Sequence, residues 1–170
     1  MDDDDFAAAV EAQIPALRRY AYALTRDHDQ ADDLVQDCLE RALSRRHLRR
    51  RDGDLRAWLF TILRNLFLND RRRRLRRGRE IGLDSEPSFG IPPLQDSGLE
   101  ARDALAALGR LPEEQQSLLL LIGVEDLSYE EAARVLGIPI GTVMSRLSRA
   151  RQRLREMLET GRPALLRRVK

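Results

Sequence analysis

A segment of 21 residues constrains the fold of this chain more than any other feature. Residues 78 to 98 hold four Gly, three Pro and three Ser, and they offer no periodic apolar face that a core could bury. On both sides of this segment, apolar residues recur every three or four positions, which is the period of an amphipathic helix. We therefore expect an all-α protein with two small helical domains, residues 1–77 and 99–170, joined by a flexible linker of residues 78–98.

The composition favours helices and excludes several classes of protein. Hydrophobic residues make up 42% of the 170 residues but aromatic residues only 5%, and 29 of the 30 basic residues are Arg. The single cysteine, Cys38, excludes an internal disulfide, and no apolar run reaches the roughly 20 residues of a membrane helix. The acidic start, with Asp at positions 2 to 5, is unlike a signal peptide, and we expect it to be disordered. We predict a cytoplasmic protein without membrane insertion.

The N-terminal region predicts three helices. The first covers residues 6–24, where Pro15 allows a break or kink, and the second covers residues 31–43, with Asp29 as its N-cap. The third runs from about residue 55 to 69, after a charged loop at residues 49–54. We expect its buried side chains to be Trp58, Leu59, Ile62, Leu63, Leu66 and Phe67.

The outer face of the second helix is acidic in a chain otherwise rich in Arg. Its members are Asp32, Asp33, Gln36, Asp37 and Glu40. One interpretation is a face that only improves solubility. The other is a docking surface for a basic protein partner.

The third helix ends in a strongly basic run, with seven Arg among residues 71 to 79. Such a run attracts phosphate groups, although many charge runs are merely solvated. The preceding turns carry Asn65 and Asn69, whose amides can pair with adenine edges.

A helix-turn-helix is the strongest motif in the C-terminal region, at residues 127–147 (LSYEEAARVLGIPIGTVMSRL). Ser128 and Glu131 form a capping box, Gly137 ends the first helix, and Thr142 lies at the start of the second. Before this motif we expect a short helix at residues 99–108 and a helix beginning at Pro112, whose apolar residues 118–122 are central to the core.

The last helix has one apolar stripe and one polar face. The buried stripe is expected to be Val143, Leu147, Ala150, Leu154 and Leu158. The polar face and its flanks comprise Thr142, Ser145, Arg146, Ser148, Arg149, Gln152 and Arg153. Residues 140–155 contain five Arg and no acidic residue, which favours reading of the DNA major groove over a merely solvated surface.

No catalytic or metal-binding constellation is evident. His28, His47 and Cys38 lack the spacing of metal ligands, and there is neither a glycine-rich phosphate loop nor a nucleophile elbow. We expect no cofactor, no metal and no enzymatic activity.

Several motifs together resemble bacterial RNA polymerase sigma factors of the small, two-domain extracytoplasmic function (ECF) group. They are DQADDLVQDCLERA at residues 29–42, WLFTILRN at 58–65, LPEEQQ at 111–116, and the helix-turn-helix, in the order of the family. The resemblance covers roughly residues 8 to 158. The segment LSYEEAA at residues 127–133 and the Arg-rich composition also resemble sigma factors of the general-stress group of α-proteobacteria.

The resemblance implies a function and three sets of contacts. The protein would bind core RNA polymerase, through the β′ clamp helices and the β subunit, and select promoters under the control of an anti-sigma factor. The acidic face, with Asp32, Asp33, Gln36, Asp37 and Glu40, would contact the polymerase. The −10 element would meet the 49–54 loop, which captures a flipped base, and the following helix, through Arg51, Asp54, Arg64, Asn65, Asn69 and Arg72.

The −35 element would be read as duplex DNA by the polar face of the last helix. The linker would let the two domains fold onto each other when the protein is not bound to DNA, which would bury both nucleic-acid faces and suggests how an anti-sigma factor could hold the protein off. A different interpretation is a helix-turn-helix repressor that binds DNA as a dimer, but no separate dimerisation helix is evident. A nucleic-acid enzyme such as a recombinase would need a catalytic constellation that the sequence lacks.

Overall fold

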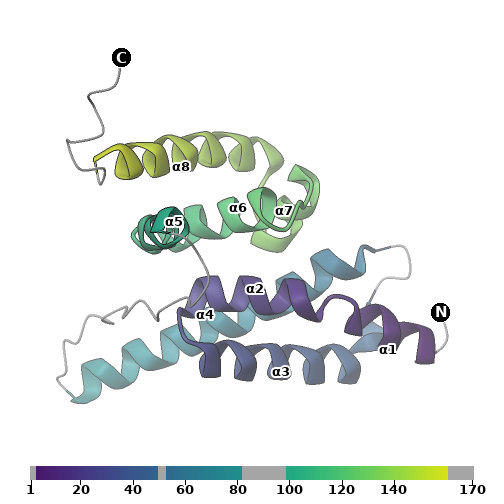
Figure 1. The fold of residues 1–170 in the computed structure, drawn as a ribbon. Helices are drawn as coiled ribbons and strands as arrows, with labels where there is room; N and C mark the ends of the chain where they lie inside the picture. The colour runs from purple at the N-terminus through teal and green to yellow at the C-terminus, as the bar shows by residue number, and fades with distance from the viewer. Residues whose placement is uncertain (1–2, 50–52, 82–98, 161–170) are drawn as a thin grey trace.

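The computed structural model describes residues 3–49, 53–81 and 99–160, which fold into two packed helical layers (Figure 1). The helices are α1 (Asp3–Glu11), α2 (Ile14–Thr25), α3 (His28–Ser44), the 3₁₀ helix η1 (Arg46–Leu48), α4 (Leu55–Ile81), α5 (Leu99–Gly109), α6 (Glu113–Gly123), α7 (Tyr129–Leu136) and α8 (Ile140–Thr160). The described residues contain no strand, which confirms the predicted all-α class. None of their helices is both long and apolar enough to cross a membrane.

The first predicted helix is two helices, α1 and α2, separated at residues 12–13. The break lies just before Pro15, which occupies the first turn of α2, where its missing N–H costs nothing. The acidic residues Asp4 and Asp5 belong to α1, so the expectation of a disordered acidic start is wrong for them. Phe6 and Val10 are buried and fix this helix to the domain.

Helix α3 starts at His28, three residues before the predicted segment 31–43. Its N-cap is Asp27, whose Oδ1 accepts a hydrogen bond of 2.8 Å from the backbone N–H of Gln30, so the assignment to Asp29 is wrong. Cys38 is fully buried on the inner face, and burial raises the pKa of its thiol to about 12. The thiol therefore stays neutral and behaves as a small apolar group.

Helix α4 is much longer than predicted, because it continues through the basic run to Ile81. The predicted linker therefore begins at least four residues too early, and its residues 82–98 lie outside the described part of the chain. Leu59 and Leu63 are fully buried as expected. Trp58, Ile62, Leu66 and Phe67 are only half-buried, and Phe60, which the pattern missed, is fully buried instead.

The helix-turn-helix has the predicted caps. The Ser128 hydroxyl accepts from the backbone N–H of Glu131 at 3.1 Å, and the Glu131 carboxylate accepts from the backbone N–H of Ser128 at 2.7 Å. Gly137 ends α7 with a φ of 66°. In α8, Val143, Leu147 and Ala150 are buried, whereas the stripe residues nearer the C-terminus are only half-buried. Pro112 is the N-cap of α6 and not its first helical residue.

We expect Gly137→Ala to lower the free energy of unfolding by about 1 kcal/mol, because Cβ disfavours the left-handed backbone. A Cβ at this position would meet nothing within 4 Å, so the whole loss is conformational. Urea unfolding followed by circular dichroism measures it. Gly141→Ala is the matched control: a Cβ there also meets nothing within 4 Å, and this residue lies within α8 with an ordinary φ. An equal loss in both variants would contradict the argument.

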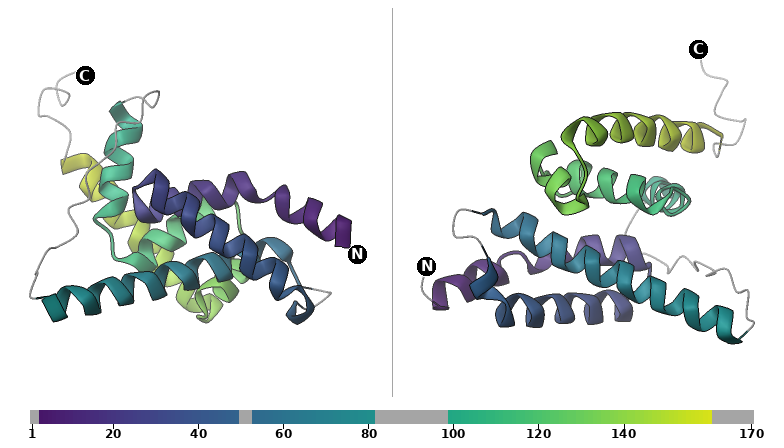
Figure 2. Two further views of the ribbon diagram at one scale, coloured as in Figure 1. Left: turned by 90° about the horizontal axis from the view of Figure 1, so that it is seen from below. Right: turned by 180° about the vertical axis from the view of Figure 1, so that it is seen from behind.

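The two domains pack directly on each other. Helices α5 to α8 lie over α2 and α4, while α3 lies on the opposite side of the N-terminal layer (Figures 1 and 2). The main apolar core runs through both layers, since Leu108, Leu121 and Leu127 join the same buried cluster as Leu17 and Leu63. We call this arrangement, in which the two domains are packed on each other, the closed form.

Candidate polymerase and nucleic-acid interfaces

The acidic face of α3 is open to solvent. All five predicted polymerase-contact residues are exposed: Asp32, Asp33, Gln36, Asp37 and Glu40. Arg18 Nε lies 3.3 Å from Asp32 Oδ1, but both side chains are more than 60% exposed, so this pair contributes little stability. Because α3 lies opposite the C-terminal helices, the closed form leaves this face uncovered (Figure 2).

Of the predicted −10 contacts that the structure describes, all but Arg64 are exposed. Asn65, Asn69 and Arg72 are exposed along α4, and Arg51 lies outside the described residues. Asp54 is exposed as well but accepts a hydrogen bond from the backbone, whereas Arg64 is buried and paired inside the protein.

Asp54 caps the start of α4. Its Oδ1 accepts a 2.8 Å hydrogen bond from the backbone N–H of Ala57. The pKa of Asp54 is below its usual value. Partial burial raises this pKa, but hydrogen bonds from the Ala57 and Arg56 amides and the charge of Arg134 are among the effects that lower it by more. The ionised cap therefore stabilises α4 at neutral pH, and this contribution is lost as the pH falls through the lowered pKa.

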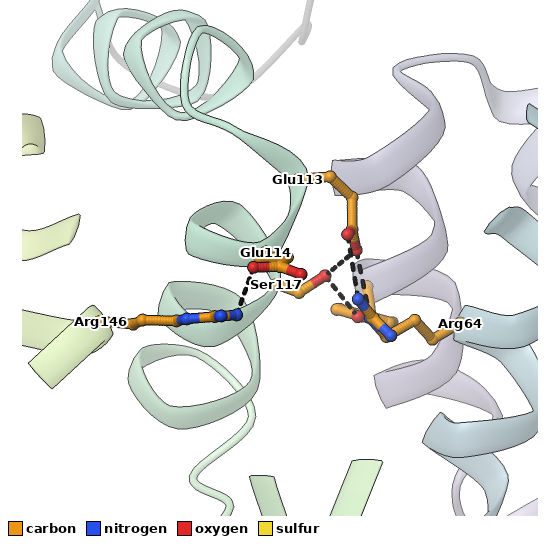
Figure 3. Close-up of polar contacts among 6 residues, drawn as sticks. Arg64, Glu113, Glu114, Ser117 and Arg146 are labelled. Carbon is orange, nitrogen blue, oxygen red and sulfur yellow. Dashed lines mark hydrogen bonds and ion pairs between the residues drawn. The ribbon is translucent and has the colours of Figure 1, made fainter. Parts of the chain in front are cut away.

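Arg64 is buried between the two domains and is therefore not available to DNA in this arrangement, while its role as a −10 contact stays a prediction. Its Nε and Nη2 lie 3.2 Å and 3.0 Å from the two carboxylate oxygens of Glu113 at the start of α6 (Figure 3). The Ser117 hydroxyl donates to the same carboxylate at 2.8 Å, and the buried Tyr20 hydroxyl donates to Ser117 at 3.0 Å. Burial raises the pKa of Tyr20 well above its usual value, so it remains a neutral donor.

A second buried carboxylate, Glu125, holds two further arginines. Arg19 of α2 donates from Nε and Nη2 to its two oxygens at 3.1 Å and 2.9 Å. Arg56 of α4 donates from Nη2 to the Glu125 backbone oxygen at 2.6 Å and to its carboxylate at 3.1 Å. The sequence analysis did not single out Glu125. This glutamate lies in the loop between α6 and α7, and no sequence pattern links it to Arg19 and Arg56, which are far away in the chain. The only hint was an acidic pair at residues 125–126 directly after an apolar helix.

The predicted −35 face belongs to α8, which lies on the side of the C-terminal layer away from α2 and α4 (Figure 1). Ser145, Ser148, Arg149, Gln152 and Arg153 are exposed, and Thr142 and Arg146 are partly exposed. These residues therefore share one accessible helical surface, and the expectation that packing of the two domains buries both nucleic-acid faces is wrong for this one.

Two arginines of this surface are tied to α6. Arg146 forms an ion pair with Glu114 (Figure 3), and Arg153 Nη1 lies 3.5 Å from Gln115 Oε1. The first turn of α6 thus contacts both candidate DNA-contacting helices, with Glu113 holding Arg64 of α4 and Glu114 holding Arg146 of α8.

Comparison with known proteins covers both domains. The model of the sigma2 domain of PhyR matches residues 10–64, and the model of sigma-70 region 4 matches residues 101–154. The ECF RNA polymerase sigma factor EcfG of Rhodopseudomonas palustris is 42% identical over 155 residues, which are 91% of this chain and 83% of the relative. SigE of Mycolicibacterium smegmatis, another ECF sigma factor, is 40% identical over 82% of this chain and 56% of its own length.

Solved structures show the same likeness. The sigma factor RpoE of Bartonella quintana, in complex with the anti-sigma factor NepR, has 42% identity and a TM-score of 0.78, covering 93% of this chain and 99% of that one. CnrH, in complex with the cytosolic domain of CnrY, has 27% identity and a TM-score of 0.71, covering 95% of this chain and 92% of that one.

The two family models together define a two-domain transcription factor of the sigma-70 type, with a sigma2 domain followed by a region 4 domain. With these relatives, the chain belongs to the ECF group of RNA polymerase sigma factors.

Proposed function

We propose that this protein binds core RNA polymerase and directs it to the promoters of a general stress response. The observation that carries the proposal is the separation of charge on exposed helices. The α3 face presents carboxylates, whereas residues 140–155 of α8 present five Arg and no acid. The first suits a basic protein surface such as the polymerase clamp helices, and the second suits DNA phosphates and base edges.

The promoter contacts are divided between the domains. The −35 element is contacted by the α8 surface, while the −10 element is contacted by the 49–54 loop and α4, where Asn65, Asn69 and Arg72 are exposed. The polymerase supplies the chemistry, so no catalytic role is assigned to this chain. We place its action in the cytoplasm, where the polymerase works.

Control by an anti-sigma factor is part of the proposal. RpoE, the relative solved with NepR, matches this chain across both domains, which supports a similar closed arrangement for an inhibited state. An anti-sigma factor that binds this closed form would keep the −10 face of α4 partly covered.

Run-off transcription with core polymerase tests the proposal. Templates selected from a genomic library by the reconstituted holoenzyme should give specific transcripts that core polymerase alone does not produce. The absence of any transcript at low salt would contradict the sigma function. Tight binding of the free protein to a palindromic duplex would instead support a dimeric repressor.

We expect Arg149→Ala to weaken selection of the −35 element by about tenfold, because one good side-chain contact to a base pair contributes about 1–3 kcal/mol. Arg149 is exposed on the outer surface of α8, so the substitution leaves the fold intact. Holoenzyme binding to promoter duplexes with intact or scrambled −35 sequences measures the effect. Arg155→Ala is the matched control, since Arg155 is exposed on the same helix but outside the predicted face. Equal losses of −35 selection in both variants would indicate a general effect of charge and not recognition of the −35 bases by Arg149.

A further inference from the structure

Beside the apolar core that the domains share, their contact contains two carboxylates that meet three arginines. Glu113 and Glu125 belong to the C-terminal layer, and Arg64, Arg56 and Arg19 belong to the N-terminal layer. The Glu125 side chain is 1% exposed and that of Glu113 is 12% exposed. Carboxylates buried to this degree need charged partners, and these two find theirs on the other domain.

The arginines involved include two from the helix proposed to contact the −10 element. Arg56 and Arg64 lie eight residues apart on α4, which places them about two turns apart on one face. A guanidinium group binds a carboxylate and a phosphate with the same forked geometry. Glu113 and Glu125 therefore compete directly with DNA phosphates for these two groups.

We propose that Glu113 and Glu125 form an interdomain latch that occupies Arg64 and Arg56 in place of DNA phosphates and keeps the free protein closed, with weak affinity for DNA. The inference rests on the proposed function for the identity of the competing ligand. Closure leaves the acidic face of α3 exposed, so the polymerase can bind the closed form before the latch opens. Opening then frees the arginines of α4 for the promoter.

Removing the charges of the latch tests the proposal in the 170-residue chain. The double variant Glu113→Gln and Glu125→Gln should shift the population towards an open form, seen as a larger radius of gyration in small-angle X-ray scattering. Its affinity for a mixed-sequence DNA duplex should rise about tenfold, within the range of typical coupling between sites. The matched control, Glu130→Gln with Glu159→Gln, changes the net charge equally at two exposed positions and should change neither quantity.

A charge swap separates the latch from a general loss of structure. Glu113→Arg alone should open the protein, because it places two guanidinium groups in contact. Glu113→Arg combined with Arg64→Glu should restore the compact radius of gyration. Thermal unfolding of each variant shows whether both domains are still folded.

The outcomes distinguish the latch from the function on which it rests. An unchanged radius of gyration in the Gln variant, or an open form with unchanged DNA affinity, overturns the latch. A swap that fails to restore compactness while the domains remain folded also overturns it. Opening with tighter DNA binding supports the latch even where run-off transcription fails, and that failure counts against the sigma function alone.

Discussion

Replacing Asp33 and Asp37 together by Arg is expected to weaken binding to core RNA polymerase by at least about 100-fold. Both side chains are exposed on the acidic face of α3, so the change leaves the core untouched. Like charges brought together across an interface cost several kcal/mol, and each 1.4 kcal/mol is a factor of ten in affinity. Titration of labelled protein with core polymerase measures the loss.

The control for this double reversal is Asp5→Arg with Glu11→Arg, which reverses two exposed charges on α1 of the same domain. This control should bind polymerase as the unaltered protein does. Binding of the α8 surface to −35 duplex DNA should be unchanged in both variants. If the α1 reversal weakened polymerase binding as much as the α3 reversal, the acidic face of α3 would not be the docking surface.

The second large effect is expected in the core. Phe60→Ala should lower the free energy of unfolding by about 3–5 kcal/mol, because it removes a fully buried aromatic ring. The Phe60 ring packs edge-on against Tyr20, with 5.2 Å between the ring centroids. Because Tyr20 also donates to Ser117 across the domain contact, the cavity should loosen the contact as well.

Urea unfolding measures this loss, and Phe67→Ala is its matched control. Phe67 lies on the same helix but is only half-buried, so the same change there should cost less than half as much. Equal costs at the two positions would mean that the burial pattern of α4 is not the one described.

The sequence predicts local features of this fold well where the determinant is local. The capping box at Ser128, the left-handed end at Gly137 and the apolar stripe of α8 depend on residues within a turn or two of each other. The physical cause of these features can be identified from a few consecutive residues. The acidic face of α3 and the basic face of α8 are local in the same sense, because side chains three or four positions apart share one side of a helix.

The sequence does not predict ion pairs between residues that lie far apart in the chain. Nothing near Arg64 in the chain indicates Glu113, and nothing near Glu125 indicates Arg19 and Arg56. The length of α4 was also missed, because a run of Arg suggests solvated chain although Arg is a good helix former. The DNA and polymerase contacts of single residues remain predictions, since they depend on surfaces of other molecules.

The length of α4 has a mechanical consequence. Its 27 residues form a rod of about 40 Å at the usual rise of 1.5 Å per residue. The Arg-rich end projects beyond the body of the molecule, while Arg56 and Arg64 lie nearer the other end (Figure 1). Because α4 is one continuous helix, a polyanion that turns its projecting end would also turn the part that carries Arg56 and Arg64 at the contact between the domains.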